Sequence, residues 1–327
     1  MITYIQPQPL YLQRRSGSQV QFVQYQRAAV RSVTLDNARV YGPGWVRAED
    51  SFAIFDSMTY SDQAAWMHAC IPIDKQFPQV DEYIDRELTL LWGYFTHDTS
   101  IPCNWSHFIW TYLLRLAFTE PTPLLVSERV PDRFLDWARA MGFTEFVKVK
   151  DGVRIGQLWV PGVLCHRDVN GAVSVLPSAV YALRQRLGVH KPPGIGRTLV
   201  YVVRGQSSPW RRVLNEETLI DALMARGFEC IQPETMTVGE QLTAMANAEV
   251  VVNPFGGASA MTMFAPEDCR VIELSFPGVA GVFAGSLWAD VLGQTYERVD
   301  GVPGEQTGKL AIDRDFTVPV EEVLKRL

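Results

Sequence analysis

The sequence predicts an α/β protein whose second half is built on a parallel β-sheet covered by helices on both faces. Three stretches carry this prediction, and they are TLVYVVR (198–204), EVVVNP (249–254) and CRVIELS (269–275). Each is mainly apolar without polar alternation, and the segments between them favour helix, which is typical of strands buried on both faces. The chain has 327 residues and 47% hydrophobic content, enough for two domains with separate cores.

The first half predicts a β-rich opening followed by alternating helices and strands. Within residues 1–60, alternating runs such as VQFVQY and FAIFDSM indicate strands. The helices predicted beyond residue 80 are 107–118, 130–143 and 178–189. A strand is predicted at 122–128, and a strand followed by a loop within 156–162. A polar Pro/Gly stretch, HKPPGIGR (190–197), indicates the domain boundary, so the predicted domains are residues 1–190 and 191–327.

In the second domain, helices separate the apolar strands. They are predicted at 215–227 and 237–248, with a Gly-rich turn entering a short helix at 257–266 and a terminal helix at 319–327. A further strand is expected at 229–234. Ligands of such sheets bind beyond the carboxyl ends of the strands, where helix N-termini point outward. Binding residues are therefore expected at the strand ends.

Bulk composition narrows the class of protein. The net charge of −6 and the pI near 5.5 argue against a dedicated nucleic-acid binder, which usually carries a basic balance. Five cysteines without a C-x-x-C pair favour neither a disulfide scaffold nor a zinc site. The N-terminus lacks the pattern of a signal peptide, and no uninterrupted run reaches the about 20 apolar residues of a membrane span. A soluble, cytoplasmic protein is the expectation.

The first candidate site is a cationic cluster between a predicted strand and the next helix. Arg204 ends the strand, and a loop leads to Arg211, Arg212, Asn215 and Glu216. Arginines at a helix N-terminus oppose the macrodipole, which favours anions there, so an external anion would explain them. Guanidinium groups suit phosphate oxygens. The alternative is a solvated basic turn whose arginines pair with neighbouring glutamates.

The second candidate is the Gly-rich turn after the strand 249–254. Gly256 and Gly257 would let the backbone approach a ligand closely, with N–H groups and the helix dipole facing a negative group. Ser259 could cap the helix or donate a hydrogen bond. The alternative is an ordinary tight turn, since the spacing differs from G-x-G-x-x-G.

Two carboxylates and an amide at the remaining strand ends form a third group, Glu234, Gln241 and Glu273. Such side chains can bind ribose hydroxyls or base edges, although helix capping and surface solvation explain each one singly.

The first half places candidate general bases just before a helix. Asp98 and His107 lie in the segment GYFTHDTSIPCNWSHF, and His and Asp are the usual general bases of enzymes. The alternative is a structural role in which His107 caps the helix or packs beside the neighbouring aromatic rings.

Taken together, these stretches resemble the glycosyltransferase 61 family, whose bacterial members are often described as capsular polysaccharide biosynthesis proteins. LDNARVYGPGWV is similar to the family's opening β segment, and GYF…NWSHFIWTYLLRL to its histidine-containing helix start. The run RGQSSPWRRVLNEETLIDALMARGFECIQPETMTVGEQLTAMANAEVVV, followed by FAPEDCRVIEL, is similar to the family's signature region. The resemblance spans most of the chain.

The resemblance implies a GT-B-like fold, in which two Rossmann-like domains face a cleft and the terminal helix 319–327 crosses back onto the first domain. It implies inverting transfer of a sugar from a nucleotide diphosphate donor, expected to be UDP-linked, to the hydroxyl group of a glycan or other acceptor. No cofactor and no essential metal are implied. Peripheral association with the inner membrane is compatible with this function, and the oligomeric state stays open.

The resemblance also assigns roles to residues. Arg204, Arg211 and Arg212 would neutralise the donor diphosphate. Asn215 and Glu216 would fix the helix start and the arginine geometry. The other donor-binding candidates are Glu234, Gln241, Gly256, Gly257, Ser259 and Glu273. Asp98 or His107 would deprotonate the acceptor hydroxyl.

The chain departs from the family pattern at three positions. Phe255 stands where a histidine normally precedes the Gly-rich turn, Met261 replaces an expected asparagine, and Thr111 stands where members often carry a carboxylate. These departures motivate an alternative function: a catalytically inactive relative that binds a nucleotide-sugar or glycan within an assembly complex.

Overall fold

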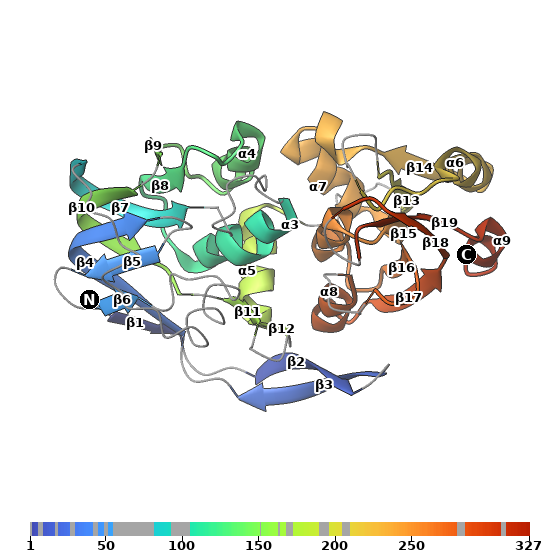
Figure 1. The fold of residues 1–327 in the computed structure, drawn as a ribbon, viewed down its shortest axis with the longest axis horizontal. Helices are drawn as coiled ribbons and strands as arrows, with labels where there is room; N and C mark the ends of the chain where they lie inside the picture. Colours follow the sequence, from blue (N-terminus) through green and yellow to red (C-terminus); the bar gives the residue numbers. More distant parts are fainter. Residues whose placement is uncertain are drawn as a thin grey trace. The chain divides into compact units, whose positions relative to one another are not determined.

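The structure is a computed structural model, and it divides into two compact units, Met1–Arg186 and Leu187–Leu327. Each unit is described by itself (Figure 1). The described residues are 2–5, 9–16, 19–26, 30–41, 45–48, 52–54, 82–92, 105–150, 152–162, 164–167, 173–189, 196–204, 210–279, 285–308 and 312–327. The boundary predicted from the Pro/Gly stretch lies four residues after the division between the units.

The first unit contains one mixed sheet, with strands in the order β6-β5-β4-β10-β7-β8-β9 and β1 paired to β4. Strands β10, β7, β8 and β9 are mutually parallel, while β1, β4, β5 and β6 pair antiparallel. The bounds are β1 Ile2–Ile5, β4 Val30–Tyr41, β5 Trp45–Ala48, β6 Phe52–Ile54, β7 Tyr83–Trp92, β8 Leu124–Ser127, β9 Phe146–Val149 and β10 Gly152–Val160. A second, antiparallel sheet contains β2 Pro9–Ser16, β3 Gln19–Gln26, β11 Cys165–Arg167 and β12 Val173–Val175. The predicted β-rich opening is confirmed for the described part of residues 1–60.

The helix predicted at 107–118 is confirmed as one continuous helical segment that changes its pitch. It begins as α3 (Trp105–His107), continues as the π-helical turn η2 (Phe108–Tyr112) and ends as the 3-10 helix η3 (Leu113–Phe118). Two further helices follow, α4 (Asp132–Ala140) and α5 (Pro177–Arg186). Arg186 of α5 donates to the carbonyls of Leu116 and Thr119, so it caps the end of the segment.

The second unit is built on the parallel sheet that the sequence predicts. Its strands are β13 Thr198–Val202, β14 Phe228–Ile231, β15 Ala248–Pro254, β16 Arg270–Ser275 and β17 Thr295–Asp300. They lie in the order β14-β13-β15-β16-β17, and all four pairings are parallel. The chain passes from β13 to β14 on one side, returns to β15 on the other side of β13, and continues outward through β16 to β17. A sheet built in this way is doubly wound, and its switch point lies between β13 and β15.

Helices cover both faces of this sheet. They are α6 Glu216–Met224, α7 Val238–Ala246, the 3-10 helices η4 Pro233–Thr235 and η5 Gly257–Phe264, and α8 Gly285–Leu292. In Figure 1, α6 lies on one side of the sheet and α7 and α8 on the other. Leu219 and Leu223 of α6 pack on Tyr201, Val250 and Val252 in the buried core. Thr237 begins α7 with a capping box, in which its hydroxyl and the Glu240 carboxylate bond each other's backbone N–H groups.

The C-terminal segment completes the unit with a hairpin and a helix. The hairpin is β18 Val302–Gln306 with β19 Arg314–Thr317, and the helix is α9 Val320–Leu324. Val323 of α9 lies in the same core as α6. The expected crossing of the terminal helix onto the first domain stays a prediction.

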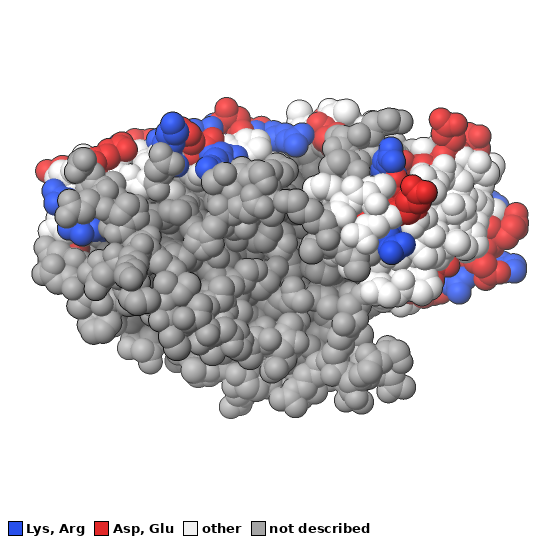
Figure 2. All heavy atoms as spheres, in the orientation of Figure 1, with Lys and Arg blue, Asp and Glu red and all other residues white. Residues whose placement is uncertain are grey.

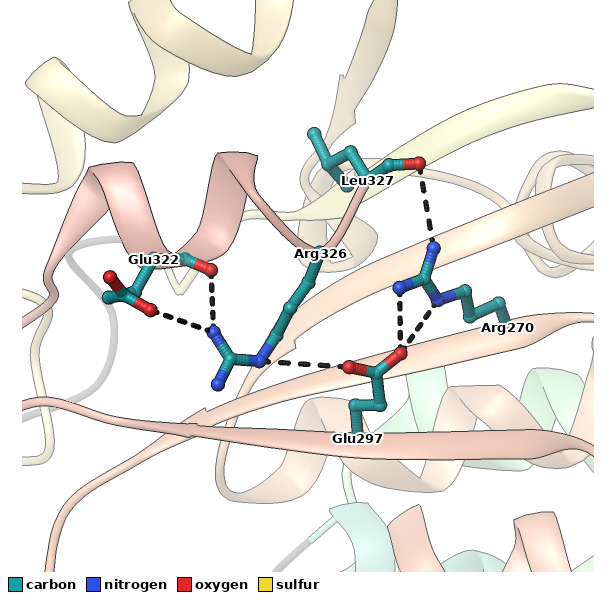
Figure 3. A network of polar contacts seen from close by, with 5 residues as sticks. All are labelled: Arg270, Glu297, Glu322, Arg326 and Leu327. Atoms are coloured by element: carbon teal, nitrogen blue, oxygen red, sulfur yellow. Dashed lines mark hydrogen bonds and ion pairs between the residues drawn. The ribbon is translucent and has the colours of Figure 1, made fainter.

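The chain end is held by an ionic network on the outer strands of the sheet (Figure 3). Glu297 of β17 accepts from Arg270 at 2.7 Å and lies 3.6 Å from Arg326. Arg326 also donates to the carbonyl of Glu322, and Arg270 reaches the carbonyl of Leu327 at 3.5 Å. The last turn of the chain is therefore fixed to β16 and β17.

Two further properties of the described residues concern helix length and surface charge. Among the described residues, no helix combines the length and the apolar character required to cross a membrane. On the face drawn in Figure 2, Lys and Arg side chains are interspersed with Asp and Glu over the described part of the second unit.

Candidate functional site

The site begins with Arg204, two residues beyond the end of β13 and therefore at the switch point of the sheet. Its backbone N–H donates to Glu216 Oε1 at 2.8 Å, and the same oxygen accepts from the Tyr201 hydroxyl at 2.8 Å. Glu216, in the first turn of α6, thus fixes the backbone from which the Arg204 side chain extends. The role expected for Glu216, holding the arginine geometry, is compatible with these two bonds.

The guanidinium of Arg204 binds two backbone carbonyls. Nη1 donates to Phe255 at 3.3 Å and Nη2 donates to Trp210 at 3.1 Å. The pKa of Arg204 is lowered to about 10, mainly by burial and also by the charge of the neighbouring Arg211. A buried cation beside a second cation is a position that favours an anion.

Gly256 follows β15 on the other side of the switch point and makes room for this guanidinium. Its φ of 140° lies in a region that residues with a side chain rarely adopt. A β-carbon at this position would overlap Nη1 of Arg204. The glycine is therefore required by the approach of an arginine side chain. Gly257 begins η5 and has open space where a β-carbon would lie.

Arg211 is the second cation of the site and is mostly buried, with 15% of its side chain exposed. Its φ of 63° is left-handed, which is uncommon for a residue other than glycine. The guanidinium lies over the Phe255 ring at 5.5 Å, and Nε is 3.9 Å from Asp313 Oδ1. Burial lowers the pKa of Arg211, and the Asp313 carboxylate opposes this shift of the pKa. The 3.9 Å separation between Nε and Oδ1 is that of a loose ion pair.

Arg212 and Asn215 point toward the C-terminal segment. Arg212 binds the Asp315 carboxylate through its backbone N–H at 2.8 Å, Nε at 2.9 Å and Nη2 at 2.6 Å. Asn215 donates to the carbonyl of Val318 at 2.8 Å and accepts from its N–H at 2.9 Å. Arg212 thus holds β19, and Asn215 holds the residue after it, next to the start of α6. The Arg212 side chain remains 54% exposed, whereas that of Asp315 is buried.

Ser259 and Glu273 form an internal network with Asn253 and Tyr296. The hydroxyl of Ser259 donates to Glu273 Oε2 at 2.7 Å and accepts from Asn253 at 3.0 Å. The Tyr296 hydroxyl donates to Glu273 Oε1 at 3.0 Å. Ser259 is fully buried and Glu273 is 4% exposed. The structure thus brings these two candidates together beneath the Gly256 turn.

The remaining candidates of the second unit lie at the end of β14. Gln241 is buried and donates to the carbonyls of Pro233 and Met236, so it fixes η4 to α7. Glu234, partly exposed in η4, accepts from Gln232 at 3.1 Å and raises the pKa of Arg204 through its charge. Glu234 is therefore close enough to Arg204 to affect its charge electrostatically.

The candidate bases belong to the first unit. Asp98 lies outside the described residues. His107 is buried at the junction of α3 and the π-helical turn, with its ring 5.1 Å from that of Trp110. Thr111 is buried within the same turn, and its carbonyl accepts from Arg115 at 2.9 Å. π-Helical turns often occur at functional sites, which is compatible with a role for His107.

Several residues of the site were missed by sequence reasoning. Trp210 contributes its backbone carbonyl, and a backbone group leaves no signal in the side-chain pattern. Asp313 and Asp315 lie about a hundred residues beyond the arginines, in a hairpin that the sequence did not predict. Asp313 and Asp315 are separated by a single residue and pair with Arg211 and Arg212. Two closely spaced carboxylates near the C-terminus were therefore the signal for partners of the two adjacent arginines.

A doubly wound parallel sheet with buried arginines at its switch point defines an α/β domain suited to an anionic ligand. The protein belongs to the glycosyltransferase 61 family, whose model matches residues 105–272. This range begins at α3, includes His107, Arg204 and Arg211, and ends one residue before Glu273. No curated protein matches the chain. Membership of the family indicates that the protein is a glycosyltransferase, with a sugar donor and an acceptor as its substrates.

Proposed function

We propose that the protein is an inverting, metal-independent glycosyltransferase of glycan or polysaccharide biosynthesis. In this proposal the donor is a nucleotide diphosphate-sugar, expected to be UDP-linked, and the acceptor is a hydroxyl group. The two units would form a GT-B-like pair facing a cleft, and the enzyme would work in the cytoplasm. The observation that carries the proposal is the pair of buried guanidinium groups, Arg204 and Arg211, at the switch point of the second unit.

The electrostatics of this pair support a diphosphate as the ligand. Burial lowers the pKa of both arginines, and the charge of Arg211 also lowers the pKa of Arg204. The Asp313 carboxylate, 3.9 Å from Arg211, offsets only part of this cost. A diphosphate bound between them would place negative charge beside both guanidinium groups. During transfer it would also gain charge as the leaving group, which the guanidinium groups would stabilise.

The chemical step needs one base and one leaving group. A base removes the proton from the acceptor hydroxyl, whose oxygen forms a bond to the anomeric carbon. The bond from that carbon to the donor phosphate breaks on the opposite face, and its electron pair leaves with the nucleotide diphosphate. In the proposal the base is His107 or Asp98. Arg212, Glu234 and Gly257 would contact the donor from the rim of the site.

Calorimetry with UDP tests the cationic pair. Arg211→Ala is expected to weaken UDP binding at least tenfold, because it removes one of the two charges that bind the diphosphate. Arg226→Ala is the matched control, since Arg226 is an exposed arginine at the end of α6. Equal UDP affinity in wild type and Arg211→Ala would reject the cationic pair as the donor site.

An assay with a panel of nucleotide-sugars tests the reaction itself. Transfer to an acceptor, or slow hydrolysis of one donor, is expected for the active enzyme. UDP binding without any product would instead support the catalytically inactive relative, a function that the substitutions Phe255, Met261 and Thr111 motivate.

A further inference from the structure

The carboxylate of Glu273 is buried inside the second unit. It lies near the end of β16, accepts from the Ser259 and Tyr296 hydroxyls, and packs against the Cα of Gly285 in α8. A β-carbon on Gly285 would lie 2.6 Å from Glu273 Oε2. Burying a carboxylate costs free energy, and hydrogen bonds that its oxygens accept offset part of this cost.

Ser259 connects this carboxylate to the Gly256 turn. Its Oγ accepts from Asn253 Nδ2 at 3.0 Å, and its backbone N–H donates to the Gly256 carbonyl at 3.1 Å. Asn253 also reaches the carbonyl of Pro254 at 3.3 Å. Because Asn253 and Ser259 lie on opposite sides of the turn, the bond between their side chains closes it, and Glu273 holds that bond in place.

The same turn holds Arg204 on its outer side. The carbonyl of Phe255 accepts from Arg204 Nη1, and the Cα of Gly256 leaves the space that the guanidinium fills. The N–H of Phe255 donates to the carbonyl of Leu274, the residue after Glu273, at 2.7 Å. The position of the Arg204 guanidinium therefore depends on the conformation of the turn.

We propose that Glu273 is a positioning residue, whose carboxylate acts through Ser259 to set the Gly256 turn and thereby the Arg204 guanidinium. A carboxylate only accepts hydrogen bonds, so it directs the Ser259 O–H toward itself and leaves Ser259 Oγ free to accept from Asn253. A protonated Glu273, or a glutamine in its place, carries an O–H or N–H donor of its own. That donor would compete with Asn253 for the lone pairs of Ser259 Oγ. That the anion bound at Arg204 is a diphosphate rests on the proposed function. The positioning role of Glu273 does not depend on which anion binds.

The titration of Glu273 supports this role. Burial raises the pKa of Glu273 to about 7, although the bonds from Ser259 and Tyr296 lower it. The other charged groups that face the carboxylate are Arg298, which lowers its pKa, and Asp300, which raises it. Both lie on β17, and Arg298 is bound to Asp300 at 2.7 Å. The carboxylate that directs Ser259 thus forms as the pH rises through neutrality.

Hydrogen exchange of the free protein tests the positioning role directly. At pH 8, Glu273→Gln is expected to exchange the amides of residues 255–259 about tenfold faster than wild type, because one hydroxyl of the network loses its acceptor. Glu229→Gln is the matched control, since it removes an exposed carboxylate from β14. Ser259→Ala, which breaks the link but keeps the carboxylate, is expected to give the same acceleration. Wild-type exchange rates in both network variants would overturn the proposal.

The pH dependence of UDP affinity distinguishes the positioning role of the Glu273 carboxylate from a purely structural role. A purely structural role would leave the ratio of UDP affinities between Glu273→Gln and wild type the same at every pH. The affinity of Glu273→Gln relative to wild type is expected to fall about tenfold between pH 6 and pH 8.5. Tyr296→Phe removes a bond that stabilises the ionised carboxylate, so it is expected to shift the midpoint of this dependence upward and keep the affinity at high pH. A constant ratio between Glu273→Gln and wild type at every pH would overturn the inference. Failure of wild type to bind UDP would reject the proposed function alone, since hydrogen exchange tests the turn without ligand.

Discussion

The guanidinium of Arg204 occupies the space that a β-carbon on Gly256 would need. The two residues follow strands that are adjacent in the sheet but about fifty residues apart in the sequence. The glycine therefore leaves room for the Arg204 guanidinium at the switch point of the sheet. This relationship joins two sequence candidates, the arginine cluster and the Gly-rich turn, into one site.

Gly256→Ala is expected to disrupt the site. The new β-carbon would overlap the Arg204 guanidinium, and the φ of 140° would be strained for alanine. Strain of this kind costs about 1–3 kcal/mol, so we expect a lower midpoint of urea unfolding together with weaker UDP binding. Gly239→Ala is the control, because no atom lies within 4 Å of the place where its β-carbon would be. Unchanged UDP affinity in Gly256→Ala would mean that the turn does not position Arg204.

Asp313→Asn is expected to strengthen anion binding. Asp313 is a counter-ion of Arg211 at 3.9 Å, and a bound diphosphate would compete with it. An ion pair of this kind contributes about 1 kcal/mol. Without the Asp313 charge, this free energy would go to the binding of UDP, which should bind about fivefold more tightly in calorimetry. Asp268→Asn, at an exposed carboxylate paired with Arg197, is the control. Weaker binding would instead show that Asp313 orients Arg211 for the ligand.

The sheet of the second unit could be predicted because its strands are uninterrupted apolar runs. The strands 198–204 and 249–254 correspond to β13 and β15, and the cationic cluster lies at the predicted end of β13. The elements from α8 to β19 were missed, since β17 and β18 contain many polar residues and pair only at the edge or in a hairpin. Local patterns carry little information about such strands.

The partners of the site residues could not be read from the sequence. Arg212 and Asn215 contact Asp315 and Val318, about a hundred residues away, and long-range contacts of this kind follow from the hairpin. Ser259 was expected at a ligand, and its burial against Glu273 depends on the register between β15 and β16. The residue types indicated the chemistry, whereas the fold decided which groups face the ligand.

Stability should depend on pH through Glu273. Its pKa is raised from 4.5 to about 7 in the folded protein, so the folded state keeps a proton that the unfolded state has lost between these values. Stability is therefore expected to fall as the pH rises from about 4.5 to about 7, by up to about 3 kcal/mol at 1.36 kcal/mol per pKa unit. Urea unfolding of Glu273→Gln between pH 5 and pH 8 should lack this decrease. A parallel decrease in wild type and variant would assign it to other groups.

Asn215→Ala separates a structural role from donor binding. The amide of Asn215 makes two hydrogen bonds to the backbone of Val318, and its loss leaves that N–H and carbonyl without these partners. Each unsatisfied buried group costs about 1–3 kcal/mol, so the free energy of unfolding should fall by at least that amount. UDP affinity, measured by calorimetry well below the unfolding transition, should stay within about twofold of wild type, because Arg204 and Arg211 do not depend on this amide. Loss of UDP affinity with unchanged stability would instead place Asn215 in contact with the donor, as the family resemblance implies.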